Sequence, residues 1–439
     1  MMSKQISSTL AFLLGLGLLA AATFTFTVAG LATPQTAGAA TTRNAAVVAA
    51  TVAILKETSE IRELEVLRPV KSGAQTRADI ERMIIRNLNE QTTPAEMRAS
   101  EVGLKKLGLA PPDFEYRAFI IKLLSEQVAG YYDTKTREFY LADWIELEGQ
   151  KPVMAHELTH ALQDQHFNLQ RFEKWPKGDS DAELAAHALI EGDATLAMTL
   201  YMARNPLIAL AFVRSLSATQ SSTEQLKRAP RVLRESLVFP YEQGSEWATK
   251  LYRRGGWAEV SGAYKKLPLS TEHIMHPDKY YAYEAPVKVT LPDLRPLLGT
   301  GWNRIDYDVT GEWGYYLFLD EFLNNTASSK RAAAGWAGDR YALYEGPKIG
   351  EVLIAQLTAW DSAADAQEFY DAYARRTELR YQGAKENELG MSSVGGQQRR
   401  VWSTAEGLAL IEIRGDRVLI IEGVPEDANV DALLRLIGK

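Results

Sequence analysis

VMAHELTHAL, at residues 153–162, sets two histidines and a glutamate inside an apolar run. Four residues along an α-helix advance about 400°, so His156 and His160 are expected one above the other on the same face. Two imidazoles at this spacing can bind one tetrahedral Zn²⁺. Glu157 lies about 100° round the helix, where its carboxylate can take a proton from a zinc-bound water. The motif therefore predicts a zinc site rather than a helix with two chance surface histidines.

A second helix, expected from about Ser180 to Ala203, supplies the predicted third ligand, Glu191. A carboxylate within an apolar helix is costly to bury unless it is paired or bound to a metal. His166 is the competing candidate, because it follows the first histidine by ten residues. However, Gln163 stands where a glycine would let the helix stop, so we expect the helix to continue and carry His166 away from the metal. His187, one turn before Glu191, is expected to be structural.

The composition limits which residues can bind a metal and which partners the chain can have. The 439-residue chain has no cysteine and a formal net charge of −7. The lack of cysteine excludes disulfides, thiol nucleophiles and cysteine metal ligands, so a metal must be bound by histidine and carboxylate. No basic stripe indicates a nucleic-acid partner.

The first 42 residues predict a targeting segment. Lys4 precedes an uncharged stretch that lasts until Arg43, and its apolar block at residues 9–32 is long enough to span a bilayer. Small residues at 37–39 would serve as a cleavage site. A cleaved export signal and an uncleaved membrane anchor are both open, with the signal favoured. Either one predicts that the folded part is extracytoplasmic.

The rest of the chain predicts an α+β fold in two units. Residues 58–340 read as a mainly helical domain with a small sheet, and residues 341–439 as a small antiparallel α+β unit. In the first unit, alternating apolar and charged residues predict a strand at Ile61–Val70. Residues Gly130–Ala142 read as a β-hairpin just upstream of the zinc helix. An extended peptide could pair with such an edge, although a purely structural hairpin fits the sequence as well.

The motif helix and the second helix together resemble a known class of enzyme. HELTHALQDQHF at residues 156–167, with ALIEGDA at residues 188–194, resembles the gluzincin-type zinc metallopeptidases. More narrowly, it is similar to a group of exported bacterial and haloarchaeal proteins described as metallopeptidases or surface proteins. The resemblance extends over roughly residues 67–344, through GYYD (130–133), FPY (239–241), GGW (255–257) and STEHIMHP (270–277).

The resemblance implies a zincin-like domain that hydrolyses peptide bonds in a peptide or protein substrate. It implies that His156, His160 and Glu191 bind Zn²⁺ and that Glu157 is the general base. One position departs from the pattern. Gluzincins commonly place an aspartate four residues after the glutamate ligand to orient the first histidine. This chain has Thr195 there, with the nearest carboxylate at position 193, so the group that orients His156 is left open.

Two further expectations complete the analysis. The polar, aromatic loop at residues 270–280 contains His276 and Tyr280, either of which could stabilise an oxyanion, with plain loop packing as the alternative. The alternative to an enzyme is a non-catalytic, zinc-containing surface or envelope-assembly binding protein. An intact Glu157 favours the enzyme, because a structural zinc site needs no base. The sequence does not specify an oligomeric state.

Overall fold

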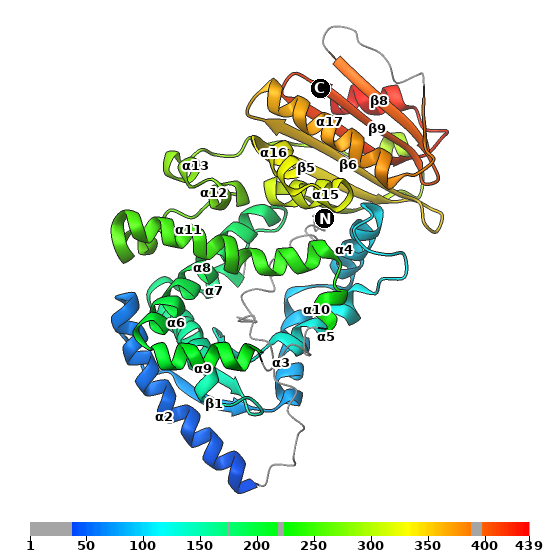
Figure 1. The fold of residues 1–439 in the computed structure, drawn as a ribbon. Coiled ribbons are helices and arrows are strands. Elements are labelled where there is room, and N and C mark those ends of the chain that lie inside the picture. Colours follow the sequence, from blue (N-terminus) through cyan, green and yellow to red (C-terminus); the bar gives the residue numbers. More distant parts are fainter. Residues whose placement is uncertain (1–36, 174, 218–223, 388–396, 439) are drawn as a thin grey trace, which may run out of the picture.

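The computed structural model describes residues 37–173, 175–217, 224–387 and 397–438. Helices form the lower part of the molecule in Figure 1, and a large antiparallel sheet with its own helices forms the upper part. The predicted α+β class is therefore confirmed. The apolar block at residues 9–32 lies outside the described residues.

The lower part is built from helices whose ends are set by local sequence. Thr76 and Thr93 each form a capping box with the acidic residue three positions later, which fixes the starts of α3 and α4. In chain order, the helices of this part are α2 (Ala37–Arg62), α3 (Arg77–Gln91), α4 (Pro94–Lys106), α5 (Tyr116–Gln127), η2 (Glu148–Gln150), α6 (Lys151–Phe167), α7 (Gln170–Glu173), α8 (Ser180–Arg204), α9 (Pro206–Ser217), α10 (Glu224–Arg228), α11 (Arg231–Ala263), α12 (Thr271–Met275), α13 (Pro277–Ala282) and α14 (Arg295–Leu298).

A three-stranded sheet lies beside α6. Its order is β1-β3-β2, with β1 at Lys71–Gln75, β2 at Gly130–Asp133 and β3 at Glu138–Ala142. The predicted hairpin is confirmed as β2 and β3, and β2 is one of the two edge strands. The strand expected at residues 61–70 is wrong. Ile61 and Arg62 end α2 instead, because Arg62 is drawn into a buried ion pair with Asp193.

The upper part is a seven-stranded sheet of order β4-β5-β6-β10-β9-β8-β7. The boundary expected at residue 341 falls inside β5, and the sheet begins with β4, so the C-terminal unit starts earlier than predicted. Two helices separate β4 from its partner β5. The pairing therefore joins segments that are far apart in the sequence, and patterns among neighbouring residues did not predict it. The elements are β4 (Asn303–Asp308), α15 (Gly311–Leu323), α16 (Thr326–Ala333), β5 (Trp336–Glu345), β6 (Val352–Trp360), α17 (Ala363–Arg380), β7 (Lys385–Glu386), β8 (Gln397–Thr404), β9 (Gly407–Arg414), β10 (Arg417–Val424) and α18 (Val430–Ile437).

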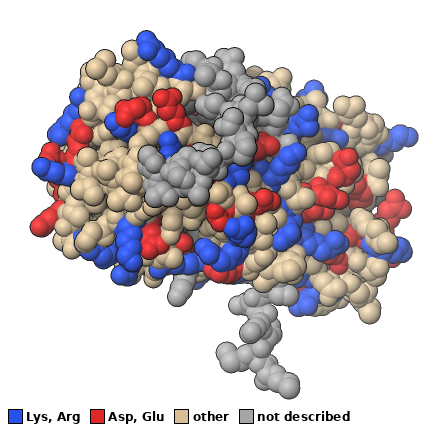
Figure 2. All heavy atoms as spheres, turned by 90° about the horizontal axis from the view of Figure 1, so that it is seen from below, with Lys and Arg blue, Asp and Glu red and all other residues tan. Residues whose placement is uncertain are grey.

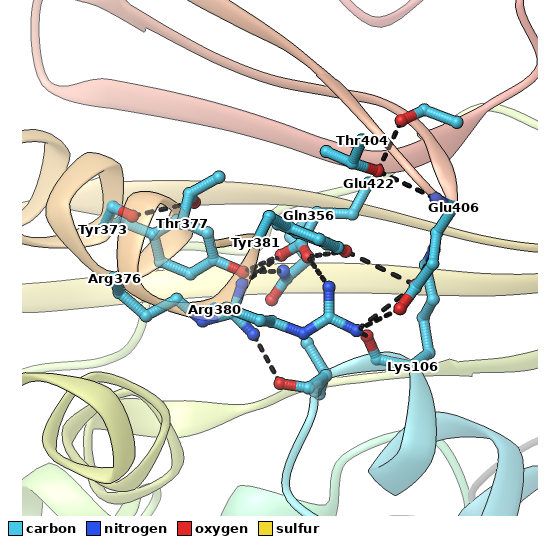
Figure 3. Close-up of polar contacts among 12 residues, drawn as sticks. Lys106, Gln356, Tyr373, Arg376, Thr377, Arg380, Tyr381, Thr404, Glu406 and Glu422 are labelled. Atoms are coloured by element: carbon cyan, nitrogen blue, oxygen red, sulfur yellow. Dashed lines mark hydrogen bonds and ion pairs between the residues drawn. The ribbon is translucent and has the colours of Figure 1, made fainter. Parts of the chain in front are cut away.

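A buried ion-pair network joins the two parts, as Figure 3 shows. Glu422 on β10 accepts a hydrogen bond of 2.7 Å from Arg376 on α17. The same guanidinium donates to the carbonyl of Leu107, at the end of α4, at 2.6 Å. Arg380, one turn further along α17, donates to the carbonyl of Lys106. Because Arg376 and Glu422 are at most 1% exposed, the pair holds α4 against the sheet without competition from water.

None of the described helices is, by itself, long and apolar enough to cross a bilayer. The pair α8 and α9 meets the length and composition only when taken together, and it is bent by 115°.

Candidate metal site

The motif helix forms as predicted and lies in the core. α6 begins at Lys151 with Pro152 in its first turn, where the missing N–H leaves no hydrogen bond unmade. His156 is fully buried and His160 is 5% exposed. Their rings meet edge to face with centroids 4.7 Å apart, and their Nε2 atoms are 3.1 Å apart. One helical turn therefore brings the two ring nitrogens together.

α8 supplies a carboxylate to the same point. Glu191 is 1% exposed, and its Oε2 lies 3.1 Å from Nε2 of His156 and 3.4 Å from Nε2 of His160. Ligands about 2.05 Å from a tetrahedral Zn²⁺ are separated by about 3.3 Å, so all three spacings fit the edges of such a tetrahedron. These are the residues that could hold a metal ion, and no other such group occurs among the described residues.

The electrostatics of the group fit a cation. Burial by itself would raise the pKa of Glu191, but the two histidines hold the pKa at about 2. Burial lowers the pKa of His156 below its usual value. Burial also acts to lower the pKa of His160, but Glu191 outweighs this effect and raises it. The carboxylate is thus stabilised in its charged form in a place that excludes water.

Glu157 lies beside this group without joining it. Its Oε2 accepts a hydrogen bond of 3.0 Å from the backbone N–H of Tyr132 on β2. Its Oε1 is buried and has no hydrogen-bond partner among the described residues. Burial, followed by the charge of Glu191, raises the pKa of Glu157 well above its usual value. A cation between the histidines and Glu191 would favour the charged form of Glu157 and so lower its pKa again.

Gln163 orients His160, and sequence reasoning missed this role. Its Nε2 donates to the carbonyl of Ile190 and to Asp193, both at 3.0 Å. The amide oxygen therefore faces Nδ1 of His160 at 2.8 Å and must accept a hydrogen bond from its N–H. Neutral His160 consequently carries its lone pair on Nε2, the atom that faces Glu191 and His156.

Asp193 helps to hold Gln163 in the orientation that faces His160. It accepts two hydrogen bonds from Arg62, at 2.5 and 3.0 Å, and one of 2.9 Å from the hydroxyl of Tyr264. Asp193 therefore acts on His160 through Gln163, and it does not contact His156. The Nδ1 of His156 has no hydrogen-bond partner among the described residues, and Thr195 does not supply one.

Tyr241 on α11 is the second residue that the sequence analysis missed. Its ring stacks on His156 with centroids 6.0 Å apart. Burial, the charges of Glu191 and Glu157, and a hydrogen bond to Glu191 raise the pKa of Tyr241 well above its usual value. The backbones of α8 and α11 touch near it. A Cβ at Gly192 would lie 2.2 Å from the backbone of Gly244, which is one turn after Tyr241.

The structure does not bring the other candidate histidines into the group. His166 is exposed, and its Nε2 bonds to the carbonyl of Glu65 at 2.8 Å. His276, named as a candidate for oxyanion stabilisation, pairs instead with Glu312 at 2.8 Å. The hydroxyl of Tyr280 donates to a backbone carbonyl 2.9 Å away. His187 is buried within α8.

Comparison with known proteins identifies a family model that matches part of the chain. A family model described as a domain of unknown function (DUF8575) matches residues 297–434, which run from the end of α14 to α18. The match covers the C-terminal unit and excludes α6 and α8, the helices that carry the metal-site residues. Neither the curated proteins nor the solved structures contain a match to this chain.

Proposed function

We propose that this chain is an exported zinc-dependent metallopeptidase. The observation that supports the proposal best is the convergence of two histidine Nε2 atoms and one carboxylate oxygen at spacings of 3.1 to 3.4 Å. Because Gln163 accepts a hydrogen bond from the Nδ1–H of His160, Nε2 of His160 and Oε2 of Glu191 face each other as acceptors, an arrangement that a cation would stabilise. Histidine and carboxylate ligands at tetrahedral spacing favour Zn²⁺. Bound there, the ion would activate water and polarise a peptide carbonyl.

Glu157 is the proposed general base. Its Oε2 is held by the N–H of Tyr132, whereas Oε1 keeps its lone pairs free in a buried setting. This oxygen could take a proton from an attacking water and return it to the leaving amine. Tyr241 is the proposed oxyanion donor, since its hydroxyl lies next to Glu191 and its high pKa keeps it protonated.

The edge of β2 is the proposed binding element for the substrate main chain. The carbonyls of Ala129 and Asp133 point to β3, where they accept hydrogen bonds. The backbone groups of Gly130 and Tyr132 therefore point away from β3, on the side of Glu157, at an edge that is buried and must open before a peptide can pair with it. A peptide in extended form could add to this edge and bring its carbonyl toward the general base.

The test separates metal binding from turnover. Wild-type protein and Glu157→Gln are compared for zinc content by elemental analysis and for cleavage of a broad peptide library by mass spectrometry. The variant should keep zinc and its fold while losing cleavage, because only the base has been removed. His166→Ala is the control, since that side chain lies at the surface, and it should keep both properties.

A non-catalytic, zinc-containing surface or envelope-assembly protein is the second candidate function. The burial of the site supports it, because His156, Glu157 and Glu191 are at most 1% exposed and a peptide reaches them only after movement. A wild-type protein that holds stoichiometric zinc and cleaves nothing in the library would favour this candidate over the enzyme.

A further inference from the structure

The outer face of α2 is apolar. No charged residue occurs between Arg43 and Lys56. Val48 is 41% exposed and Val52 is 68% exposed, and their spacing of four residues puts them on the same side of the helix. An amphipathic helix on a protein surface normally places charged residues on its outer side. Between Arg43 and Lys56, the outer side of α2 therefore lacks the composition expected for contact with water.

α9 has a second apolar outer face. Leu207, Leu210 and Val213 are 82%, 47% and 54% exposed, and their three-residue spacing lines them along one side of the helix. Ten large apolar side chains are exposed among the described residues, and five of them belong to α2 and α9. This concentration is not the scatter of single apolar residues that a protein surface ordinarily shows.

The two helices meet at one end and are linked through η2 at the other. Asn205, directly before α9, donates a hydrogen bond of 2.6 Å to Glu57 on α2. At the other end, Arg43 of α2 donates to the carbonyl of Ile145, which closely precedes η2. η2 packs along the end of α9, where a Cβ at Gly149 would lie 3.1 Å from Ser215. α2 and α9 therefore share a hydrogen bond at one end and η2 at the other, and both lie on the side away from the C-terminal sheet (Figure 1).

The chain enters this end of the molecule from its most apolar stretch. The uncharged block at residues 9–32 ends five residues before Ala37, where α2 begins. Five residues reach at most about 18 Å even when fully extended. A block that spans a bilayer would therefore keep the start of α2 close to the membrane surface. We propose that the outer faces of α2 and α9 rest on the lipid bilayer and form a membrane-docking surface.

The charges around this surface predict how its docking responds to salt. Arg204 and Arg214 flank the apolar face of α9 and are exposed, but acidic and basic side chains are mixed over this end of the molecule (Figure 2). Apolar burial rather than attraction to anionic lipid must then supply most of the binding. Docking should persist at high salt, where the interactions of exposed charges are screened.

The absence of native cysteine makes a direct test available. Val52→Cys and Leu210→Cys are each introduced into the full chain and labelled with an environment-sensitive fluorophore. The protein is reconstituted with vesicles of phosphatidylethanolamine and phosphatidylglycerol, with and without lipids that carry nitroxide quenchers. Ile349→Cys is the matched control, because Ile349 is fully exposed in the C-terminal unit.

We expect a several-fold rise in fluorescence and strong nitroxide quenching at positions 52 and 210, in low and high salt, and neither effect at position 349. Adding Leu207→Glu should reduce the quenching at position 52 without unfolding the protein, because Leu207 is 82% exposed. Labels at 52 and 210 that behave like the label at 349 would overturn the proposal. A fluorescence rise without quenching would also overturn it, because protein would then cover the faces. Protein dilution would show whether that cover is a second copy or another segment of this chain.

Discussion

Replacing Gln163 by methionine tests how the metal site is held. Methionine has a similar volume, but its thioether is only a weak acceptor for the Nδ1–H of His160 and cannot donate to Asp193. Metal binding requires a lone pair on Nε2 of His160, so the proton must stay on Nδ1. In the variant this N–H is buried without a partner, because His160 is only 5% exposed. The metal-bound form therefore loses stability that the other ligands cannot restore.

The size of the effect follows from this unsatisfied donor. An unpaired buried N–H costs about 1–3 kcal/mol, which agrees with the roughly 10- to 100-fold loss of metal affinity typical when a hydrogen bond to a ligand is removed. The fold should survive, because Asp193 keeps its bonds from Arg62 and Tyr264. We therefore expect weaker zinc binding with a smaller loss of stability in the absence of zinc.

The assay is a zinc titration against a chromophoric chelator, together with thermal melts with and without zinc. Gln165→Met is the matched control on the same helix. Gln165 also makes three hydrogen bonds, to the N–H of Leu67 and to the N–H and carbonyl of Arg68, but it contacts no metal-site residue. The control should lose some stability and keep its zinc affinity. Equal zinc affinity in Gln163→Met and wild type would refute the orienting role of Gln163.

Three further outcomes are expected. Glu191→Ala should weaken zinc binding severely and His166→Ala should leave it nearly unchanged in the same titration, whereas the reverse order would make His166 the ligand. Burial and a neighbouring carboxylate raise the pKa of Asp308 to about 8, so the folded state binds this proton more tightly than the unfolded state. Its contribution to stability is present below about pH 4 and is lost progressively as the pH rises toward 8. Urea melts should show a flatter pH dependence for Asp308→Asn, and an unchanged slope would point to another group. Glu422→Gln leaves Arg376 buried without a counter-charge and should cost about 3–5 kcal/mol in the same melts, and a loss below 1 kcal/mol would contradict the role of this pair in holding α4 against the sheet.

Some features of the site could be predicted from sequence because they depend only on residues that are close together in the chain. The positions of His156 and His160 on one helical face depend only on the helical repeat. The helix that carries Glu191 begins at Ser180, as expected, because Asp179 caps it.

The roles of Gln163 and Tyr241 depend on contacts between distant segments. Gln163 entered the sequence analysis only as a residue that is not glycine, and its partner Asp193 lies 30 residues away on another helix. Tyr241 reaches His156 because α8 and α11 touch at Gly192 and Gly244. Glycine within a helix costs about 1 kcal/mol relative to alanine, so these two positions were the available signal for a close helix contact.

A contact between distant segments also connects the metal site to the C-terminal unit. Asp308, the last residue of β4, accepts a hydrogen bond of 3.0 Å from the N–H of Ser180, the first residue of α8. α8 carries Glu191 three turns further on, so a strand of the C-terminal sheet fixes the start of a helix that holds a metal-site residue. A fragment that ended at residue 340 would retain β4 but lose most of the sheet that positions it. The two parts of the chain should therefore fold as one unit, with the buried pair of Arg376 and Glu422 as their second connection.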